Sequence, residues 1–195
     1  MTDTIALFDF DGTLTRKDSL GEFIKFAVGK PNYYAKLLLF SPIFVLYKTK
    51  LMDNSYAKKL LFKLYFNGVT KSYFTKVARE YGKTKIYDII REEIYDKFLA
   101  HIENGDRVLI VSASMKCWLE PFATKHKVEL LCTELKFKDA KFTGEFATKN
   151  CHGEEKLTRV QAYLNLDDYE KIYTYGDSSG DDAILAIADV EVKVK

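Results

Sequence analysis

Short apolar runs typical of buried β-strands stand at both ends of this 195-residue chain, with a long stretch between them that contains none. The first run is Ile5–Phe8, and the others lie in the second half of the chain, at 107–112, 170–175 and 190–194. Continuous apolar strands of this kind are typical of a parallel sheet that is buried on both faces. We therefore predict an α/β fold, with a Rossmann-like parallel sheet that is interrupted after its first strand.

The stretch from residue 18 to residue 104 has the pattern of consecutive helices. Asp18 or Ser19 can cap the first of these helices, and Gly82 lies in a segment that is predicted to end a later one. The last helix is expected to run from about residue 84 to residue 103. Beyond the second strand, a small antiparallel hairpin is expected at 134–147, around a Lys-Asp-Ala-Lys turn.

The domain limits follow from the change between strand-like and helix-like patterns along the chain, because no repeat or Pro/Gly-rich linker marks a boundary. We assign residues 1–15 and 105–195 to an α/β core domain and residues 16–104 to a helical cap domain. The last helix of the cap can equally belong to the core.

Composition narrows the class of protein. Apolar residues make up 47% of the chain, enough for a real core, and the net charge of +2 without a long basic block argues against nucleic-acid binding. Three cysteines without metal spacing are typical of reduced thiols in a cytoplasmic protein, with Cys117 and Cys132 expected in the core. The N-terminal residues do not have the pattern of a secretion signal.

The most apolar part of the insertion is Leu37–Tyr47, which is bracketed by lysines. It is shorter than the roughly 18 to 20 apolar residues that a membrane-spanning helix needs. Three interpretations stay open: a buried helix, a contact or substrate-pocket surface, or a segment that lies on a bilayer. The last would place the protein peripherally at the inner membrane face.

Asp9 and Asp11 are the first candidate functional residues. They follow the first strand directly and stand two residues apart, so both carboxylates face one spot at the strand end. Two carboxylates that close need a cation between them or a proton on one of them. A carboxylate can also act as a nucleophile that carries a phosphoryl group. A solvated strand end is the alternative for this pair taken alone.

Ser112 ends the second strand, and Ala113 and Ser114 open the helix that follows. A hydroxyl beside free backbone N–H groups at a helix start can bind an anion, and Ser114 is expected to cap the helix. Lys156 lies in the first turn of a later helix, where the helix dipole disfavours a cation. That position favours a partner such as a phosphate or the Asp9 carboxylate.

The loop after the third strand carries three carboxylates. Asp177 stands at the strand end, where it can join Asp9 around a cation, and hard oxygen ligands of this kind fit Mg²⁺. Asp181 and Asp182 stand at the start of a helix, and capping is the preferred interpretation of Asp182. Because ligands bind beyond the carboxyl ends of parallel strands, these side chains are expected to meet at one edge of the sheet.

Together these residues form a mechanism for hydrolysis of a phosphate ester. Asp9 attacks phosphorus, and Asp11 protonates the leaving oxygen and then deprotonates the water that hydrolyses the aspartyl-phosphate. Backbone N–H groups, Ser112 and Lys156 offset the charge on the phosphate oxygens.

Four parts of the chain resemble, in their order, the four motifs of haloacid dehalogenase-superfamily phosphatases. They are the segments 9–15 and 111–112, Lys156, and the segment 176–181. The resemblance implies Mg²⁺ as cofactor and a hydrolase acting on phosphomonoesters. It implies these roles: Asp9 as nucleophile, Asp11 as general acid/base, Ser112, Ala113 and Lys156 as phosphate ligands, Asp9, Asp177 and the backbone carbonyl of Asp11 as metal ligands, and Asp181 as their support.

The helical insertion resembles the cap of the phosphoserine-phosphatase-like branch of this superfamily. In that branch an acidic residue near the position of Asp18 recognises an amino group, and an Asn stands where this chain has Gly180. For Asp18 we prefer the helix cap.

The segments 37–47 and 151–156 look more like the group related to phosphatidylglycerophosphatase C, which implies an amphiphilic or lipid phosphate as substrate. The alternatives are a phosphatase of phosphoserine or another small metabolite, a phosphotransferase that uses the same intermediate, and a non-catalytic protein that binds a membrane or a partner.

Overall fold

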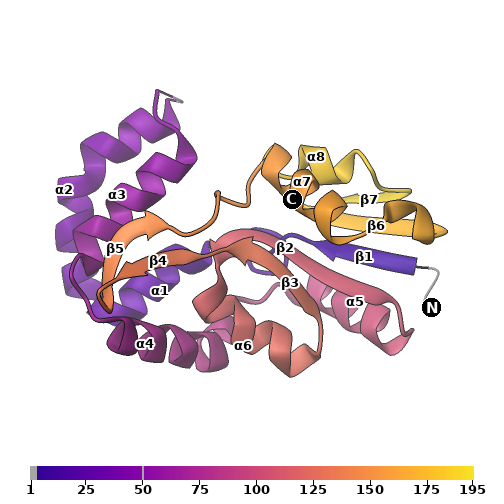
Figure 1. Cartoon of the computed structure of the whole chain (residues 1–195), viewed down its shortest axis with the longest axis horizontal. Helices are drawn as coiled ribbons and strands as arrows, with labels where there is room; N and C mark the ends of the chain where they lie inside the picture. Colours follow the sequence, from indigo (N-terminus) through magenta and orange to yellow (C-terminus); the bar gives the residue numbers. More distant parts are fainter. Residues whose placement is uncertain (1–3, 50) are drawn as a thin grey trace.

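A five-stranded parallel sheet forms the centre of the computed structural model, which describes residues 4–49 and 51–195 (Figure 1). Of Phe44, Tyr47 and Lys48 only the backbone is described. The strands lie in the order β3-β2-β1-β6-β7. Their bounds are β1 Thr4–Phe8, β2 Arg107–Met115, β3 Glu129–Thr133, β6 Lys171–Gly176 and β7 Val190–Lys193. The predicted α/β fold with a parallel Rossmann-like sheet is confirmed.

Both faces of this sheet are apolar, because alternate residues of each strand point to opposite sides. On one side Ile5 and Leu7 of β1 pack with residues of α7 (Glu154–Tyr163) and α8 (Asp182–Leu185). On the other side Phe8 packs with α5 (Glu92–Glu103) and α6 (Lys116–His126). The sheet is therefore the middle layer of three, and its carboxyl-end edge is left for a ligand.

β1 lies at the point where the strand order reverses. It pairs with β2, placing Phe8 beside Ile110, and with β6, placing Phe8 beside Tyr175. The chain proceeds from β1 outward through β2 and β3 on one side, and through β6 and β7 on the other. Such a reversal opens a crevice beyond the strand ends, which is where ligands bind in open α/β sheets. Asp9 follows β1 there, and Asp177 follows β6.

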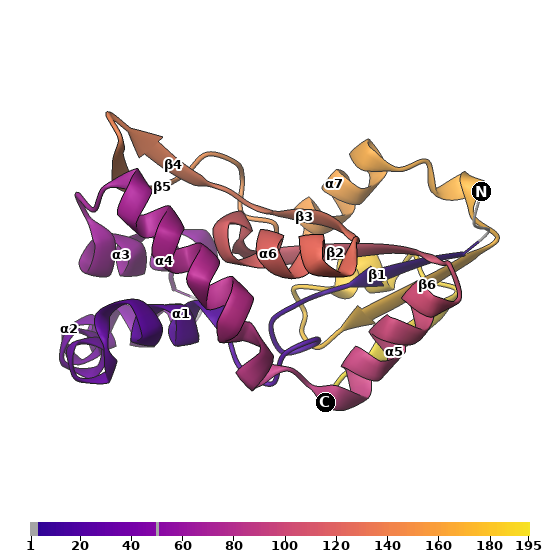
Figure 2. The same cartoon turned by 90° about the horizontal axis from the view of Figure 1, so that it is seen from below.

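The helical layer lies beside the sheet, with a two-stranded hairpin against it (Figures 1 and 2). The predicted hairpin is present, and it packs on α3 although its residues come from the segment that the sequence assigns to the core. Asp18 is confirmed as the cap of α1, since its carboxylate accepts from the Gly21 N–H at 2.9 Å. The elements are α1 Ser19–Val28, α2 Lys30–Lys48, α3 Asn54–Phe66, α4 Lys71–Thr84, the 3₁₀ turn η1 Ile86–Ile89, β4 Leu135–Lys138 and β5 Lys141–Phe146.

The last inserted helix, α5, packs on β2 of the sheet, and Phe98 on α5 meets Phe8 edge-to-face at 5.3 Å. The remaining cap helices share one aromatic cluster with α6, in which Phe23 of α1 stacks on Trp118 at 4.7 Å. The division into core and cap at the limits given above remains a prediction.

The helix end predicted at residues 81–83 is confirmed to within one residue, because α4 ends at Thr84; a Cβ at Gly82 would lie 2.2 Å from the Trp118 carbonyl oxygen, so this glycine also allows close packing of α4 on α6. Other local predictions were wrong. The helix expected at 84–103 is broken by η1, and the helix expected after Gly180 is the single turn α8. Strand β3 was not predicted.

The apolar segment Leu37–Tyr47 forms most of α2. In the part of the chain that the structure describes, no helix is both long and apolar enough to cross a bilayer. Among the cysteines, Cys132 is buried as predicted, whereas Cys117 on α6 is only partly buried.

Candidate active site

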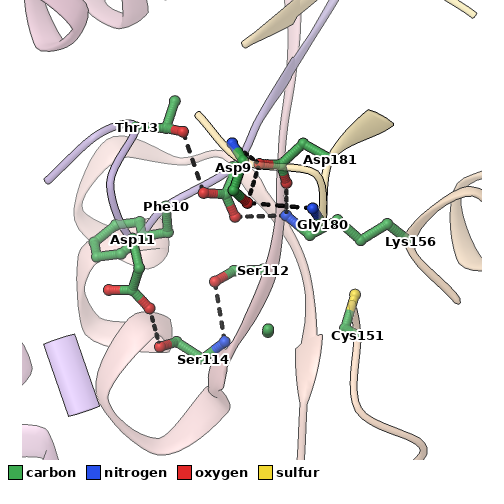
Figure 3. A network of polar contacts seen from close by, with 12 residues as sticks. Asp9, Phe10, Asp11, Thr13, Ser112, Ser114, Cys151, Lys156, Gly180 and Asp181 are labelled. Atoms are coloured by element: carbon green, nitrogen blue, oxygen red, sulfur yellow. Dashed lines mark hydrogen bonds and ion pairs between the residues drawn. The ribbon is translucent and has the colours of Figure 1, made fainter. Parts of the chain in front are cut away.

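Asp9 is held at the end of β1 by a contact of its backbone N–H and by the contacts of its carboxylate, which Figure 3 shows. Its N–H donates to the Tyr175 carbonyl at 2.9 Å, which fixes it beside β6. The side chain is buried; Oδ1 accepts from Lys156 Nζ at 2.5 Å, and Oδ2 accepts from the Thr13 hydroxyl at 3.2 Å. Burial raises the pKa of Asp9 to about 6, although the Lys156 ammonium opposes this shift.

Lys156 lies in the first turn of α7 and is only 2% exposed. Besides Asp9, its ammonium donates to Asp181 Oδ1 at 2.6 Å. Burial alone would lower the pKa of Lys156, but the two carboxylates outweigh it and raise that pKa. The partner that the helix position indicated is therefore present, and it is the Asp9 carboxylate together with Asp181.

Asp177 and Asp181 approach Asp9 from the loop after β6. One carboxylate oxygen from each of the three residues lies within 4.8 Å of the others. Both oxygens of Asp181 are engaged, because Oδ1 binds Lys156 and Oδ2 accepts from the N–H groups of Asp177 and Ser178 and from the Ser178 hydroxyl. Asp177 is exposed, and its Oδ1 accepts a hydrogen bond from the Thr13 hydroxyl at 3.4 Å.

This carboxylate cluster fits a divalent cation. Three carboxylates and one ammonium leave a net charge of −2, and oxygen donors of this kind suit Mg²⁺. Gly12 makes room for the cluster: its φ is +88°, and a Cβ there would lie 2.3 Å from Asp177 Oδ2. Asp181 is the most heavily bonded of the three, because its two oxygens accept four hydrogen bonds, so Asp9 and Asp177 are the residues that could hold the ion and Asp181 could support them.

Asp11 is turned away from this cluster. Its Oδ1 accepts from the Ser19 N–H at 2.7 Å, and its Oδ2 accepts from the Ser114 hydroxyl. The two serine hydroxyls lie 2.9 Å apart, and the Trp118 indole N–H donates to Ser19 at 3.1 Å. Burial raises the pKa of Asp11 to about 7, and the charge of Asp18 adds to this, while the two serine contacts oppose it.

Ser114 does not cap α6, which corrects the sequence prediction. The cap residue of α6 is Met115, and it makes no side-chain bond to the helix. Strand β2 continues past Ser112 to Met115, so Ser114 lies in the strand and directs its hydroxyl at Asp11. The Ser114 N–H meanwhile donates to the Ser112 hydroxyl at 3.1 Å.

A cavity of about 440 Å³ opens over these residues. Its floor includes the predicted phosphate ligands Ser112, Ala113 and Lys156, beside Asp9 and Asp11. Its other walls come from α1, α2 and α3 and carry mainly apolar side chains: Leu20, Tyr33, Leu37, Phe40, Ala57 and Leu61.

Two residues that the sequence did not single out also line this cavity. Lys58 of α3 donates to the Ala113 carbonyl, at the end region of β2, at 3.3 Å. His152 lies against Gly180, where a Cβ would come within 2.6 Å of its Nε2. Lys58 stands in no local pattern that points to a site, because it reaches the cavity through a contact between distant segments. His152 lies in the segment 151–156, whose family resemblance gave it no role of its own.

The sequence profile of the haloacid dehalogenase-like hydrolases matches residues 6–186, which is most of the chain. The chain belongs to this family of hydrolases. The family predicted from the motifs at Asp9, Ser112, Lys156 and Asp177 is therefore confirmed.

Among characterised sequences, the chain is 29% identical to Protein CicA of Caulobacter vibrioides over 187 residues, covering 95% of this chain and 83% of that protein. Among solved structures, it resembles a protein of unknown function from Bordetella pertussis Tohama I, with a TM-score of 0.81 and 22% identity over 96% of this chain and 88% of the other. It also resembles a phospho-aspartyl intermediate analogue of phosphoserine phosphatase, with a TM-score of 0.64 and 18% identity over 99% and 87% of the two chains. These likenesses in structure concern the fold.

Proposed function

We propose that this hydrolase is an Mg²⁺-dependent phosphatase that cleaves a phosphomonoester through an aspartyl-phosphate on Asp9. The observation that carries the proposal is the buried Asp9 carboxylate at the end of β1, ion-paired with Lys156 and clustered with Asp177 and Asp181 at the floor of a cavity. The structural likeness to a phospho-aspartyl form of phosphoserine phosphatase supports the same chemistry.

Each of the residues around the cavity floor has a separate role in the proposed transfer of the phosphoryl group to Asp9. Asp9 supplies the attacking oxygen, and the P–O bond to the leaving group breaks as the Asp9–phosphorus bond forms. Lys156 and the Ser112 hydroxyl lie on the cavity floor, where they offset charge on the phosphate oxygens. Asp9 and Asp177 would hold Mg²⁺, which when bound neutralises negative charge on the phosphate and favours its approach to a carboxylate.

Asp11 is the proposed acid/base. It gives its proton to the departing oxygen, and the resulting carboxylate then takes a proton from the water that hydrolyses the aspartyl-phosphate. The different surroundings of the two carboxylates support this assignment. Asp9 is ion-paired with Lys156. Asp11 has no such cation beside it; its carboxylate accepts hydrogen bonds from Ser19 and Ser114, and its pKa is raised to about 7.

The lining of the cavity favours an amphiphilic substrate. The phosphate would lie on the polar floor, and the rest of the molecule would extend along the apolar cap walls around Leu37, Phe40 and Leu61. Asp18, the residue that would recognise an amino group in a phosphoserine phosphatase, lines the cavity but caps α1 through its Oδ1. A panel that compares phosphoserine with phosphomonoesters of increasing alkyl length distinguishes these substrates, because kcat/KM rises with chain length only for an amphiphilic substrate.

Hydrolysis of p-nitrophenyl phosphate by three Asp→Asn variants tests the chemistry. Asp9→Asn is expected to lose turnover and to release no burst of p-nitrophenol. Asp11→Asn is expected to give a burst of about one product per enzyme followed by slow turnover, because the leaving phenolate needs no proton whereas hydrolysis of the intermediate needs a base. Asp182→Asn, an exposed neighbour at the start of α8, is the matched control and keeps normal turnover.

Chelation followed by Mg²⁺ addition should abolish and restore the activity of the unmodified protein. Normal turnover by Asp9→Asn, or activity that survives chelation, would refute the proposal.

A further inference from the structure

The large exposed apolar side chains of this protein are concentrated on one part of the cap. Nine such residues are found in the described part of the chain, and seven of them lie between residues 34 and 56. Leu38, Leu39 and Leu51 are 74%, 73% and 78% exposed. The α2 surface, as we call it, consists of these seven residues: Tyr34, Leu38, Leu39, Val45, Leu46, Leu51 and Tyr56. An apolar surface of this kind marks a contact site more often than a chance arrangement.

Helix α2 is apolar on two opposite sides, and each side has a separate environment. Tyr33, Leu37 and Phe40 recur at helical spacing and line the active-site cavity. Tyr34 and Leu38 lie on the outer side and face solvent. Because α2 lies at the end of the molecule remote from the sheet (Figure 1), nothing in the described chain covers this outer side.

Polar residues that interrupt the α2 surface bond back to their own helix. Pro42 has no N–H to offer the Leu38 carbonyl, and the Ser41 hydroxyl donates to that carbonyl instead, at 2.7 Å. The Thr49 hydroxyl likewise donates to the Val45 carbonyl at 3.0 Å. Such internal bonds leave fewer polar groups that need water, as contact with a nonaqueous phase requires.

The charge of this part of the chain is strongly positive. Residues 23–52 contain five lysines and no acidic residue, so they carry +5. The whole chain carries +2, which leaves −3 on all other residues together. Apolar side chains and basic residues therefore occur in the same segment, and the rest of the protein is acidic. That combination is complementary to an anionic lipid surface, which attracts lysines and accepts apolar side chains at its boundary.

We infer that the α2 surface docks the protein on an anionic bilayer, with α2 lying in the plane of the interface. The helix does not insert across the bilayer; its outer side contacts the lipid while its inner side stays on the active-site cavity. The contact is independent of catalysis, but its purpose rests on the proposed function. A phosphatase docked in this way would receive an amphiphilic substrate along the apolar cavity wall that α2 provides.

Co-sedimentation with vesicles tests the docking directly. The purified full chain is mixed with vesicles of phosphatidylcholine alone or of an equimolar mixture with phosphatidylglycerol. The protein is expected to sediment with the mixed vesicles, weakly or not at all with phosphatidylcholine alone, and several-fold less as salt is raised. The double substitution Leu38→Asp/Leu39→Asp is expected to lower binding to the mixed vesicles by about tenfold or more.

A matched pair of single substitutions separates the α2 surface from general apolarity. Tyr34 on α2 and Tyr73 on α4 are 57% and 55% exposed, so they offer lipid almost equal side-chain area. Tyr34→Asp is expected to weaken vesicle binding and Tyr73→Asp to leave it unchanged. Equal binding by Leu38→Asp/Leu39→Asp and the unmodified protein, or equal loss in the two tyrosine variants, overturns the inference.

Two further measurements distinguish a failure of the membrane docking from a failure of the proposed phosphatase function. The Asp9→Asn protein should bind vesicles normally, and the Leu38→Asp/Leu39→Asp protein should hydrolyse p-nitrophenyl phosphate normally without vesicles. Absence of binding to the mixed vesicles by an active enzyme refutes the docking alone. A dimer in sedimentation that dissociates in Leu38→Asp/Leu39→Asp would assign the surface to a second copy of the chain and also overturn the inference.

Discussion

Replacing Lys156 with methionine is expected to destabilise the protein strongly in a pH-dependent way. Methionine keeps much of the length and volume of the side chain but removes the ammonium that lies 2.5 Å from Asp9 and 2.6 Å from Asp181. Both carboxylates are buried, as is Lys156 itself. The substitution therefore leaves two like charges in a poorly solvated site without a cation between them.

The size of the effect follows from this burial. Removing one partner of a buried ion pair costs about 3 to 5 kcal/mol, because the remaining charge stays desolvated. In a chain of this length each kcal/mol shifts the thermal unfolding midpoint by roughly 2 to 4 °C, so a decrease of roughly 6 to 20 °C is expected near neutral pH in the presence of a chelator.

The direction of the pH dependence follows from the two carboxyl groups. Burial already raises the pKa of Asp9 to about 6, and Lys156 holds the pKa of Asp181 below its usual range against the effect of burial. Without the ammonium both pKa values rise. A carboxyl group whose pKa is higher in the folded than in the unfolded state lowers the free energy of unfolding at every pH above its unfolded-state pKa, which is near 4. This loss is complete above the folded-state pKa, and it decreases as pH falls through that value. The deficit should thus be largest at about pH 8 and smaller at about pH 5.

Thermal unfolding followed by circular dichroism at several pH values measures both quantities. Lys149→Met is the control, because this lysine is 84% exposed and lies 3.8 Å from Glu155; it should shift the midpoint by no more than about 2 °C. If Lys156→Met behaved like this control, or if its deficit did not depend on pH, the account of Lys156 as the cation that holds the carboxylate cluster together would be wrong.

Two further substitutions test other contacts. Gly12→Ala forces a Cβ to within 2.3 Å of Asp177 Oδ2 at a φ of +88°, so it should raise the Mg²⁺ concentration for half-maximal activity by about tenfold or more, measured by titration after chelation. Glu129→Gln breaks a double hydrogen bond from Arg107, at 2.7 and 2.8 Å, and should cost about 0.5 to 1 kcal/mol at neutral pH. Because Arg107 lowers the pKa of Glu129, this difference should disappear as pH falls through that lowered pKa, as urea unfolding at each pH can show.

The sequence predicted the centre of the fold and of the site because their signals are local. Strand β1 is a continuous apolar run, and the residue that follows it is necessarily at the carboxyl end of the sheet. The same holds for Asp177 after β6. Lys156 was found through a conflict between its charge and its position in the first turn of α7, which only a partner could resolve.

The predictions failed where a contact between distant segments overrode a local sequence preference. Ser114 has the chemistry of a cap, but strand β2 runs on past Ser112, with a register shift against β3. Gly82 lies in the last turn of α4, near the predicted helix end, and its close contact with α6 was not predicted. Strand β3 escaped prediction because Glu129–Thr133 has only three apolar residues and lies at the sheet edge, partly buried.

Asp9 and Asp11 are only two residues apart, yet different parts of the fold fix their carboxylates. Asp9 is bonded to Lys156 of α7 and to Thr13 of the adjoining turn, so its position depends on the sheet and its own loop. Asp11 is bonded to the N–H of Ser19, at the start of the first cap helix, and to Ser114 of β2. In the proposed mechanism, a shift of α1 would therefore disturb the acid/base more than the nucleophile, because Asp11 is bonded to a residue of α1 and Asp9 is not.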